Sequence, residues 1–357
     1  MKMKLLILFG GLSSEHEVSR VSASSIVRNA DKEKYDLVTV GITKDGRWLL
    51  YENPDPDKMA SGAWEQDACI PALLSADRSV HGLTILRDGV AQTMRIDCCF
   101  PVLHGFGGED GTIQGLLTLA GIPFVGPGVA ASANSMDKSL TKVLVDRAGV
   151  RQAAYYVALR ADFEKDAQAL MQGVMHTLSH FPVFIKPCSS GSSVGVHKAT
   201  DLDTLREGLE EAFHWDEKVM VEEFIAGREI EVAVMGNTEP VASLAGEIAP
   251  TQEFYTYDAK YKDESSALYI PARIPEEAMQ TVRQNALRVY QAMGCRGLSR
   301  VDFFCTFENN EIIFNEINTM PGFTAISMYP MLWEARGVGK EKLVDDLLEH
   351  ALKRYER

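Results

Sequence analysis

SRVDFFCTFENNEIIFNEINTMPGFT (Ser299–Thr324) contains two strand-like runs of mixed apolar and polar residues, separated by Glu-Asn-Asn. This pattern predicts a β-hairpin. If Glu-Asn-Asn forms the loop, Asp302 lies opposite Glu316 across the hairpin. Arg300 then lies opposite Asn318. Side chains two residues apart share a face of a strand, so we expect all four polar groups on one face.

The carboxylates on this face indicate a metal site. Two carboxylates directly opposite each other repel, and a divalent cation removes that repulsion. We expect Asp302, Glu316 and Asn318 to hold Mg²⁺, because oxygen donors suit this ion and a nucleotide's phosphates can complete its shell. The alternative is a solvated polar face, since Val301 and Ile317 cover the other face in either case. A loop of another length would pair Asp302 with a different residue, such as Ile317.

A second segment, KPCSSGSSVG (Lys186–Gly195), suits phosphate binding. It is not the GxxxxGK[ST] loop, because its lysine precedes the glycine and a strand-like run follows. Backbone N–H groups and hydroxyls such as those of Ser192 and Ser193 can still surround phosphate oxygens; a flexible surface hairpin is the alternative. A predicted helix before it carries Lys138 and Lys142 one turn apart on one face. With the acidic hairpin, these are the recurring parts of a phosphoryl-transfer site.

The first third of the chain alternates strand-like and helix-like segments. This alternation predicts a parallel sheet covered on both faces. Ligands of such sheets gather at the carboxyl ends of the strands, so we expect the loops at Gly10 and His104 to face one crevice. The predicted strands and helices are Leu5–Phe9, Val18–Asn29, Tyr35–Ile42, Asp97–Leu103 and Thr112–Gly121.

The rest of the chain divides less regularly. A Gly/Ala/Ser-rich stretch, Val125–Ser135, indicates a domain boundary, and a helix is expected from there to Gly149. Lys218–Gly236 is predicted to be a pair of strands. The polar stretch Pro250–Ser266 is too long for a simple turn. Apolar residues at helical spacing predict a terminal helix over residues 340–357.

Composition narrows the classes of function. A length of 357 residues suggests two or three domains. A net charge of −14 argues against nucleic acid and anionic membranes as partners. The six cysteines show no CxxC or zinc spacing, as is typical of reduced cytosolic proteins. The apolar runs are too short for a signal peptide or a membrane span, so we expect a cytoplasmic protein.

Seven blocks, in this order and spacing, resemble the D-alanine–D-alanine ligases of the ATP-grasp superfamily. They are GGLSSEHEVS, HGFGGEDGTIQG, SMDKSLTK, KPCSSGSSVG, EFYTYDAKY, SRVDFF and NEINTMPGFTAISMYP. The resemblance implies an α/β fold, α+β in its C-terminal two-thirds. It implies three domains: an N-terminal Rossmann-like parallel-sheet domain (1–130), a central ATP-grasp subdomain (131–220) and a C-terminal subdomain (221–357) with a lid over about 250–266.

The resemblance also implies a reaction. The carboxylate of one D-alanine attacks the γ-phosphorus of ATP, giving D-alanyl phosphate and ADP, and the amine of a second D-alanine then displaces phosphate. The product serves peptidoglycan precursor synthesis. The implied cofactor is Mg²⁺, as two ions, with Mn²⁺ as a substitute. The implied assembly is a homodimer.

Functional residues carry over from the family by position. Arg300 and the Gly322 N–H would hold the tetrahedral oxyanion. Glu15 would form a hydrogen-bonded triad with Ser192 and Tyr261, which fastens the lid and excludes water. The implied substrate contacts are Glu15, His104, Lys260, Ser327 and Met328. The implied ATP contacts are Lys138, Lys186, Ser192, Ser193, Glu222, Glu223, Ile225, Glu229 and Lys260. The family often has Lys where Glu223 stands, which leaves its side chain without an assigned role.

Other interpretations predict different features. His104 and the tyrosines of residues 255–261 suit structural roles when taken alone. An NAD-dependent oxidoreductase would need a GxGxxG loop, and Gly10-Gly11 has no third glycine at that spacing. A non-catalytic ATP-binding module would not need every catalytic position filled. Within the family, Tyr261 argues against a D-lactate-using ligase. Apolar Met328 favours D-alanine as second substrate, and D-serine stays an alternative because FPVLHG and GITKDGRW resemble the serine-making group.

Overall fold

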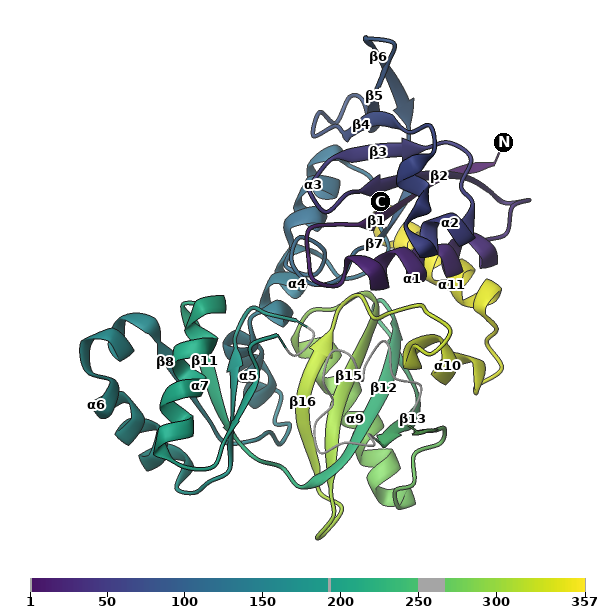
Figure 1. Cartoon of the computed structure of the whole chain (residues 1–357). Coiled ribbons are helices and arrows are strands. Elements are labelled where there is room, and N and C mark those ends of the chain that lie inside the picture. The colour runs from purple at the N-terminus through teal and green to yellow at the C-terminus, as the bar shows by residue number, and fades with distance from the viewer. Residues whose placement is uncertain (1, 192–193, 250–266, 357) are drawn as a thin grey trace.

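The computed structural model describes residues 2–191, 194–249 and 267–356, and its strands form three sheets. Figure 1 shows the first sheet above the other two, which lie side by side. The first sheet has the strand order β6-β5-β4-β3-β2-β1-β7. Its strands are β1 (Met3–Gly10), β2 (Tyr35–Ile42), β3 (Trp48–Tyr51), β4 (Ile70–Leu74), β5 (Gly82–Arg87), β6 (Val90–Arg95) and β7 (Cys98–Val102). Its helical segments are α1 (His16–Asn29), α2 (Pro56–Ser61), η1 (Ala63–Gln66) and α3 (Thr112–Ala120).

The predicted parallel pairing holds for only part of this sheet. β1 pairs in parallel with β2 and β7, and its residues from Leu5 onward are buried, as expected for a strand covered on both faces. The strands from β3 to β6 pair antiparallel with their neighbours. A short turn containing Gly46, at φ +85°, joins β2 to β3, and so tight a connection permits only antiparallel strands.

The second sheet has the order β10-β9-β11-β8 and is antiparallel throughout. The predicted strand–loop–strand around KPCSSGSSVG is confirmed, because β9 pairs with β10. The elements are β8 (Tyr155–Leu159), α6 (Arg160–Leu178), β9 (Val183–Pro187), β10 (His197–Ala199), α7 (Leu202–Trp215) and β11 (Lys218–Glu223).

The third sheet, of order β14-β13-β12-β15-β16, corrects one prediction. The strands predicted as a pair over Lys218–Gly236 are β11 and β12, but they belong to different sheets. β12 has β13 on one side and β15 on the other, so it has no free edge for β11. The elements are β12 (Gly227–Gly236), β13 (Val241–Ala249), β14 (Ala267–Tyr269), α9 (Glu276–Ala292), β15 (Gly297–Thr306), β16 (Ile312–Asn318) and α10 (Met328–Glu334).

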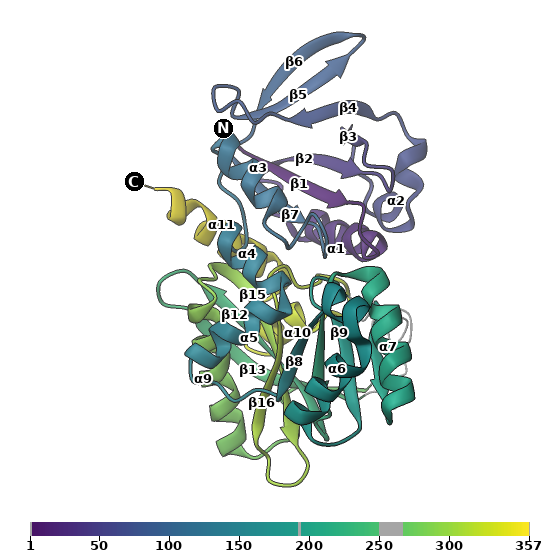
Figure 2. The same cartoon turned by 90° about the vertical axis from the view of Figure 1, so that its left-hand side faces the viewer.

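Three further helices join the parts. The Gly/Ala/Ser-rich boundary stretch is largely helical, as α4 (Val129–Met136), and α5 (Lys138–Arg147) follows with Asp137 as its N-cap. The predicted terminal helix is α11 (Lys340–Tyr355), which lies between the first sheet and the other two (Figure 2). Its Leu343 and Leu347 share a buried cluster with Leu5 and Ile7 of β1. Within the described residues, no helix is long and apolar enough to span a membrane.

Candidate active site

The β15–β16 hairpin has the predicted pairs but not the predicted loop. Asp302 lies opposite Glu316, and Arg300 lies opposite Asn318. The loop is one residue longer than predicted, because the Thr306 N–H donates to the Glu311 carbonyl at 3.0 Å. The pairs next to the loop are therefore out of step with those near Asp302. A β-bulge after Asp302 absorbs the extra residue and restores the register.

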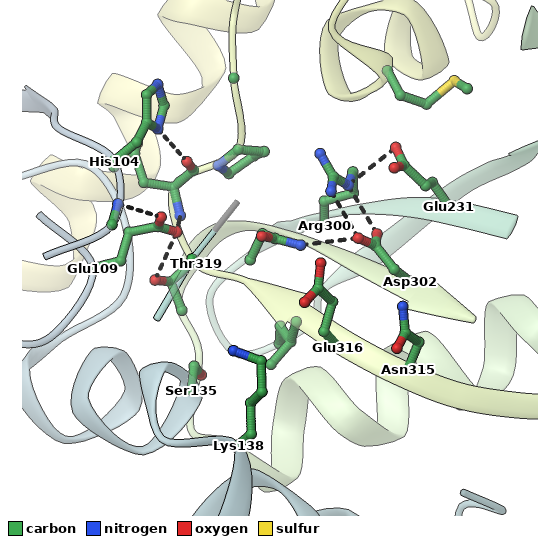
Figure 3. A pocket seen from close by; sticks show the side chains of 18 of the residues that line it. His104, Glu109, Ser135, Lys138, Glu231, Arg300, Asp302, Asn315, Glu316 and Thr319 are labelled. Carbon is green, nitrogen blue, oxygen red and sulfur yellow. Dashed lines mark hydrogen bonds and ion pairs between the residues drawn. The ribbon is translucent and has the colours of Figure 1, made fainter. Parts of the chain in front are cut away.

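Acidic residues form a row across three strands of this sheet. Glu231 of β12 lies opposite Asp302 of β15, which lies opposite Glu316 of β16. Arg300 bridges the first two: its Nε is 3.0 Å from Glu231 Oε2, and its Nη2 donates to Asp302 Oδ2 at 2.7 Å. Asn318 Nδ2 donates to the same Asp302 oxygen at 2.9 Å. Figure 3 shows the Arg300 guanidinium joined to both Glu231 and Asp302, with Glu316 beside Asp302.

The donor set on this hairpin fits a divalent cation. Asp302 and Glu316 present two opposed carboxylates, and the side chain of Asn318 adds a carbonyl oxygen on the same face. Among the described residues, no three His, Cys, Asp or Glu side chains converge as metal ligands. Two protein carboxylates with one amide match an ion such as Mg²⁺, which takes its remaining oxygens from phosphates and water.

Two lysines approach the acidic hairpin from the second sheet and from α5. Lys138 Nζ donates to the Ser190 carbonyl at 2.6 Å, and its side chain extends toward Glu316 in Figure 3. Burial lowers the pKa of Lys138. Lys186 reaches the same cavity from the end of β9. The pair sets positive charge beside the carboxylates, as a triphosphate with its cation requires.

A buried ion triplet supports Lys186. Glu222 Oε2 is 2.7 Å from Lys186 Nζ, and Glu222 Oε1 is 2.5 Å from Lys142 Nζ. Burial raises the pKa of Glu222, but the two lysines outweigh it and hold this pKa at about 2. Lys142 is 2% exposed and was predicted only to share a face with Lys138. Sequence reasoning gave it no role, because its partner is 80 residues away on another element.

The first sheet contributes two loops that meet at Glu15. Ser13 Oγ donates to the His104 carbonyl at 2.8 Å, which ties the loop after β1 to the loop after β7. The prediction that these loops face one crevice is confirmed, because Glu15 and His104 line the same cavity. A Cβ at Gly105, or at Gly191 in the loop after β9, would lie 2.6 or 2.9 Å from Glu15 Oε2, so both loops approach this carboxylate closely.

His104 and Glu109 bind the backbone on both sides of one residue, Met320. His104 Nδ1 donates to the Met320 carbonyl at 2.8 Å, and Glu109 Oε1 accepts the Met320 N–H at 2.7 Å. Glu109 Oε2 also accepts the Gly105 N–H at 2.9 Å. The remaining ring nitrogen of His104 lies 3.2 Å from Ser22 Oγ. Both ring nitrogens thus face protein groups, and the predicted contact of His104 with a substrate carboxylate stays a prediction.

Glu109 is another site residue, besides Lys142 and Glu231, that sequence reasoning missed. Burial and the nearby Glu15 raise its pKa to about 7. Burial has the opposite effect on His104: it disfavours the charged imidazolium and so lowers the pKa of this side chain. The only sequence signal was an acidic residue directly after Gly-Gly in a loop at a predicted strand end. Figure 3 shows Glu109 and His104 approaching the same segment of chain beside Thr319.

The other predicted residues divide into three groups. Of the predicted residues not yet described, Glu229, Gly322, Ser327 and Met328 line the cavity. Glu223 and Ile225 are not among the lining residues, and their backbone contacts with ATP stay a prediction. The Glu223 side chain, which was given no role, accepts the Ala154 N–H through Oε1 at 2.8 Å. Predictions for Ser192, Ser193, Lys260, Tyr261 and the lid over 250–266 lie outside the described residues.

Comparisons with known proteins agree with this geometry. A family model described as the D-ala D-ala ligase N-terminus matches residues 4–127, and one described as the D-ala D-ala ligase C-terminus matches residues 144–349. The D-alanine–D-alanine ligase of Acetivibrio thermocellus is 47% identical, with 99% of this chain and 97% of that protein covered.

Two solved structures extend the likeness to the fold. The VanG D-Ala:D-Ser ligase from Enterococcus faecalis has a TM-score of 0.89 and 38% identity, covering 98% of this chain and 100% of that one. The D-alanine–D-alanine ligase from Coxiella burnetii has a TM-score of 0.85 and 34% identity, covering 99% and 96%. By sequence and by structure along nearly its whole length, this chain belongs to the D-alanine–D-alanine ligase family.

Proposed function

We propose that the protein joins two D-alanine molecules into D-alanyl-D-alanine at the expense of ATP. The observation that carries the proposal is one cavity lined by three kinds of group. Lys138 and Lys186 supply positive charge, Asp302 and Glu316 supply opposed carboxylates, and Glu15 supplies an anion from the first sheet. A nucleotide with its cation fits the first two kinds, and an amino acid's ammonium group fits the third.

The first step activates a carboxylate. Glu15, 7% exposed, holds the ammonium group of the first D-alanine by charge. The carboxylate oxygen of this D-alanine forms a bond to the γ-phosphorus as the bond to ADP breaks. Lys138 and Lys186 stabilise the charge on the phosphates. A divalent cation on Asp302, Glu316 and Asn318 would neutralise the transferring phosphoryl group. We propose two Mg²⁺ ions, with Mn²⁺ as an effective substitute.

The second step forms the peptide bond. The neutral amine of the second D-alanine attacks the acyl carbon, the bond from that carbon to the phosphate oxygen breaks, and phosphate leaves carrying the proton that the amine loses. Arg300 and the Gly322 N–H are proposed to stabilise the oxyanion. The bidentate hydrogen bonds from Arg300 to Asp302, at 2.8 and 2.7 Å, fix the guanidinium before substrate binds. Ser327 and the Met328 backbone are proposed to hold the second carboxylate.

The runner-up is a D-alanine–D-serine ligase. The observation that supports this alternative is the similarity to the Enterococcus faecalis D-Ala:D-Ser ligase, at 38% identity. At the proposed site of the second amino acid, the cavity is lined by the apolar side chains of Met328, Ile248 and Leu268. Such a wall offers no hydrogen bond to a hydroxyl, so we favour D-alanine as second substrate.

A phosphate-release assay with ATP, Mg²⁺ and D-alanine tests the proposal. We expect phosphate release that depends on D-alanine, with D-alanyl-D-alanine identified by mass. Phosphate release without dependence on D-alanine would refute the ligase assignment. An equimolar mixture of D-alanine and D-serine separates the two candidates, because a dominant D-alanyl-D-serine product would select the runner-up.

Several features of the working protein are part of the proposal. We infer domain limits of 1–130, 131–220 and 221–357, which follow the three sheets except that the second limit falls within β11. We also infer a homodimer acting in the cytoplasm, where ATP is available, with a product used for cell-wall precursors. Light scattering tests the dimer, and cell fractionation tests the compartment.

A further inference from the structure

Gly246 leaves a gap in the sheet beneath the proposed second-substrate site. It is a buried residue of β13 and lies opposite Glu231 of β12. Ile248, two residues further along, shares its face of the strand. Both Glu231 and Ile248 line the cavity, so this face of the sheet forms part of the cavity wall. At Gly246 that wall has no side chain of its own.

The Met328 side chain fills this gap. A Cβ at Gly246 would lie 2.7 Å from Met328 Sδ and 3.1 Å from both Met328 Cε and Leu332 Cδ2. The shortest of these distances is well inside ordinary van der Waals contact, which begins at 3.4 Å. The thioether can therefore lie against the backbone of β13 only because residue 246 is glycine.

A methyl group added at residue 246 can displace the Met328 side chain in only one direction. Leu332 is fully buried and approaches the same place from one turn further along α10, so it blocks the side away from the cavity. Met328 is 3% exposed but lines the cavity. Because buried side chains are closely packed, a methyl group at residue 246 moves the thioether toward the cavity.

We propose that Gly246 is a specificity-determining residue, which sets the space for the side chain of the second amino acid by positioning Met328. This inference rests on the proposed ligase function. It differs from a direct contact, because Gly246 acts only through the depth at which the Met328 thioether lies. A methyl side chain fits the space, and longer side chains depend on how far Met328 can retract.

A competition assay measures this space directly. The enzyme receives ATP, Mg²⁺ and D-alanine with an equal concentration of D-2-aminobutyrate, whose ethyl side chain is one methylene longer. Tandem mass spectrometry, whose fragment ions distinguish D-alanyl-D-2-aminobutyrate from its sequence isomer of equal mass, gives the ratio of D-alanyl-D-2-aminobutyrate to D-alanyl-D-alanine. We expect Gly246→Ala to lower this ratio by about tenfold, the low end of what one methylene costs in a closed apolar pocket. Partial unfolding does not change the ratio, because both products come from the same folded molecules.

A double-variant cycle tests whether the effect passes through Met328. We expect Met328→Ala to raise the ratio, since it removes the thioether from the wall. In the Met328→Ala background, Gly246→Ala should change the ratio by less than about twofold, because its steric partner is gone. An equal effect of Gly246→Ala in both backgrounds would overturn the proposal.

Gly208→Ala is the matched control. Gly208 is a buried glycine of α7, where a Cβ would lie 2.4 Å from the end of another flexible apolar side chain, Ile185 Cδ1. We expect it to leave the product ratio unchanged, whatever it does to thermal stability. If the wild type forms no dipeptide, the proposed function fails. If the wild type forms it but Gly246→Ala leaves the ratio unchanged, this inference alone fails.

Discussion

Replacing Lys142 with Met tests the ion triplet that holds Glu222. The substitution keeps most of the side-chain volume and removes the charge that lies 2.5 Å from Glu222 Oε1. In the folded protein, Lys142 and Lys186 together lower the pKa of Glu222 from 4.5 to about 2. At about 1.4 kcal/mol for each pKa unit, the triplet contributes about 3 kcal/mol to folding. Because Lys186 remains, we expect the variant to lose about 2 kcal/mol.

The dependence on pH distinguishes this cause from a packing defect. A carboxylate whose pKa is depressed in the fold adds stability above its unfolded pKa, and that stability disappears as the pH falls through the folded pKa. The difference between wild type and Lys142→Met should therefore be full at about pH 7 and narrow as the pH falls from 4.5 toward 2. Urea unfolding at several pH values measures the difference.

Lys218→Met provides the matched control. Lys218 pairs with Asp137, but the two side chains are 29% and 18% exposed, so this pair is more accessible to solvent than the triplet. We expect its loss to cost less than about 1 kcal/mol. A pH-independent loss in Lys142→Met, or a loss no larger than that of Lys218→Met, would refute the reasoning.

Three further outcomes are expected. Asp302→Asn should abolish phosphate release while D-alanine binding, measured by calorimetry, largely survives; loss of folding would instead favour a structural hairpin. Arg300→Lys should lower kcat by about 10²-fold, because lysine cannot reproduce the bidentate contact or the oxyanion geometry; an unchanged kcat would remove Arg300 from that role. Glu109 has its pKa raised to about 7, so its ionisation makes wild-type stability fall as pH rises from 4.5 to 7. In Glu109→Gln, this fall in the free energy of unfolding between pH 4.5 and pH 7, measured with urea, should be smaller by up to about 3 kcal/mol. The same fall in the variant as in the wild type would contradict the assignment.

The hairpin shows both the reach and the limit of sequence reasoning. The pairing of Asp302 with Glu316 was predicted correctly, although the loop was predicted one residue too short. Two local deviations cancelled, because the bulge beside Asp302 offsets the longer loop. A bulge depends on how a strand bends across its neighbours, and the alternation of polar and apolar residues carries no mark of it.

Long-range partners were the other limit. Local patterns identified β11 and β12 as strands, but their neighbours are chosen by the whole sheet, and they separate into two sheets. The roles of Lys142 and Glu109 likewise depend on Glu222 and Met320, which are distant in sequence. Lys138, Lys186, Asp302 and Glu316, by contrast, were predicted as site residues because each occurs in a short motif with its own chemistry.

The position of α11 has a consequence for the order in which the protein is made. Tyr35 at the start of β2 donates a hydrogen bond to Asp345 of α11, which is synthesised 310 residues later. The buried face of β1 also packs against this helix, because Leu5 and Ile7 lie in one cluster with Leu343 and Leu347. During translation, the first sheet therefore emerges with an apolar face that α1 covers only in part and α11 covers later. A ribosome-bound chain stalled before α11 would carry the loops of Glu15 and His104 on an unfinished core.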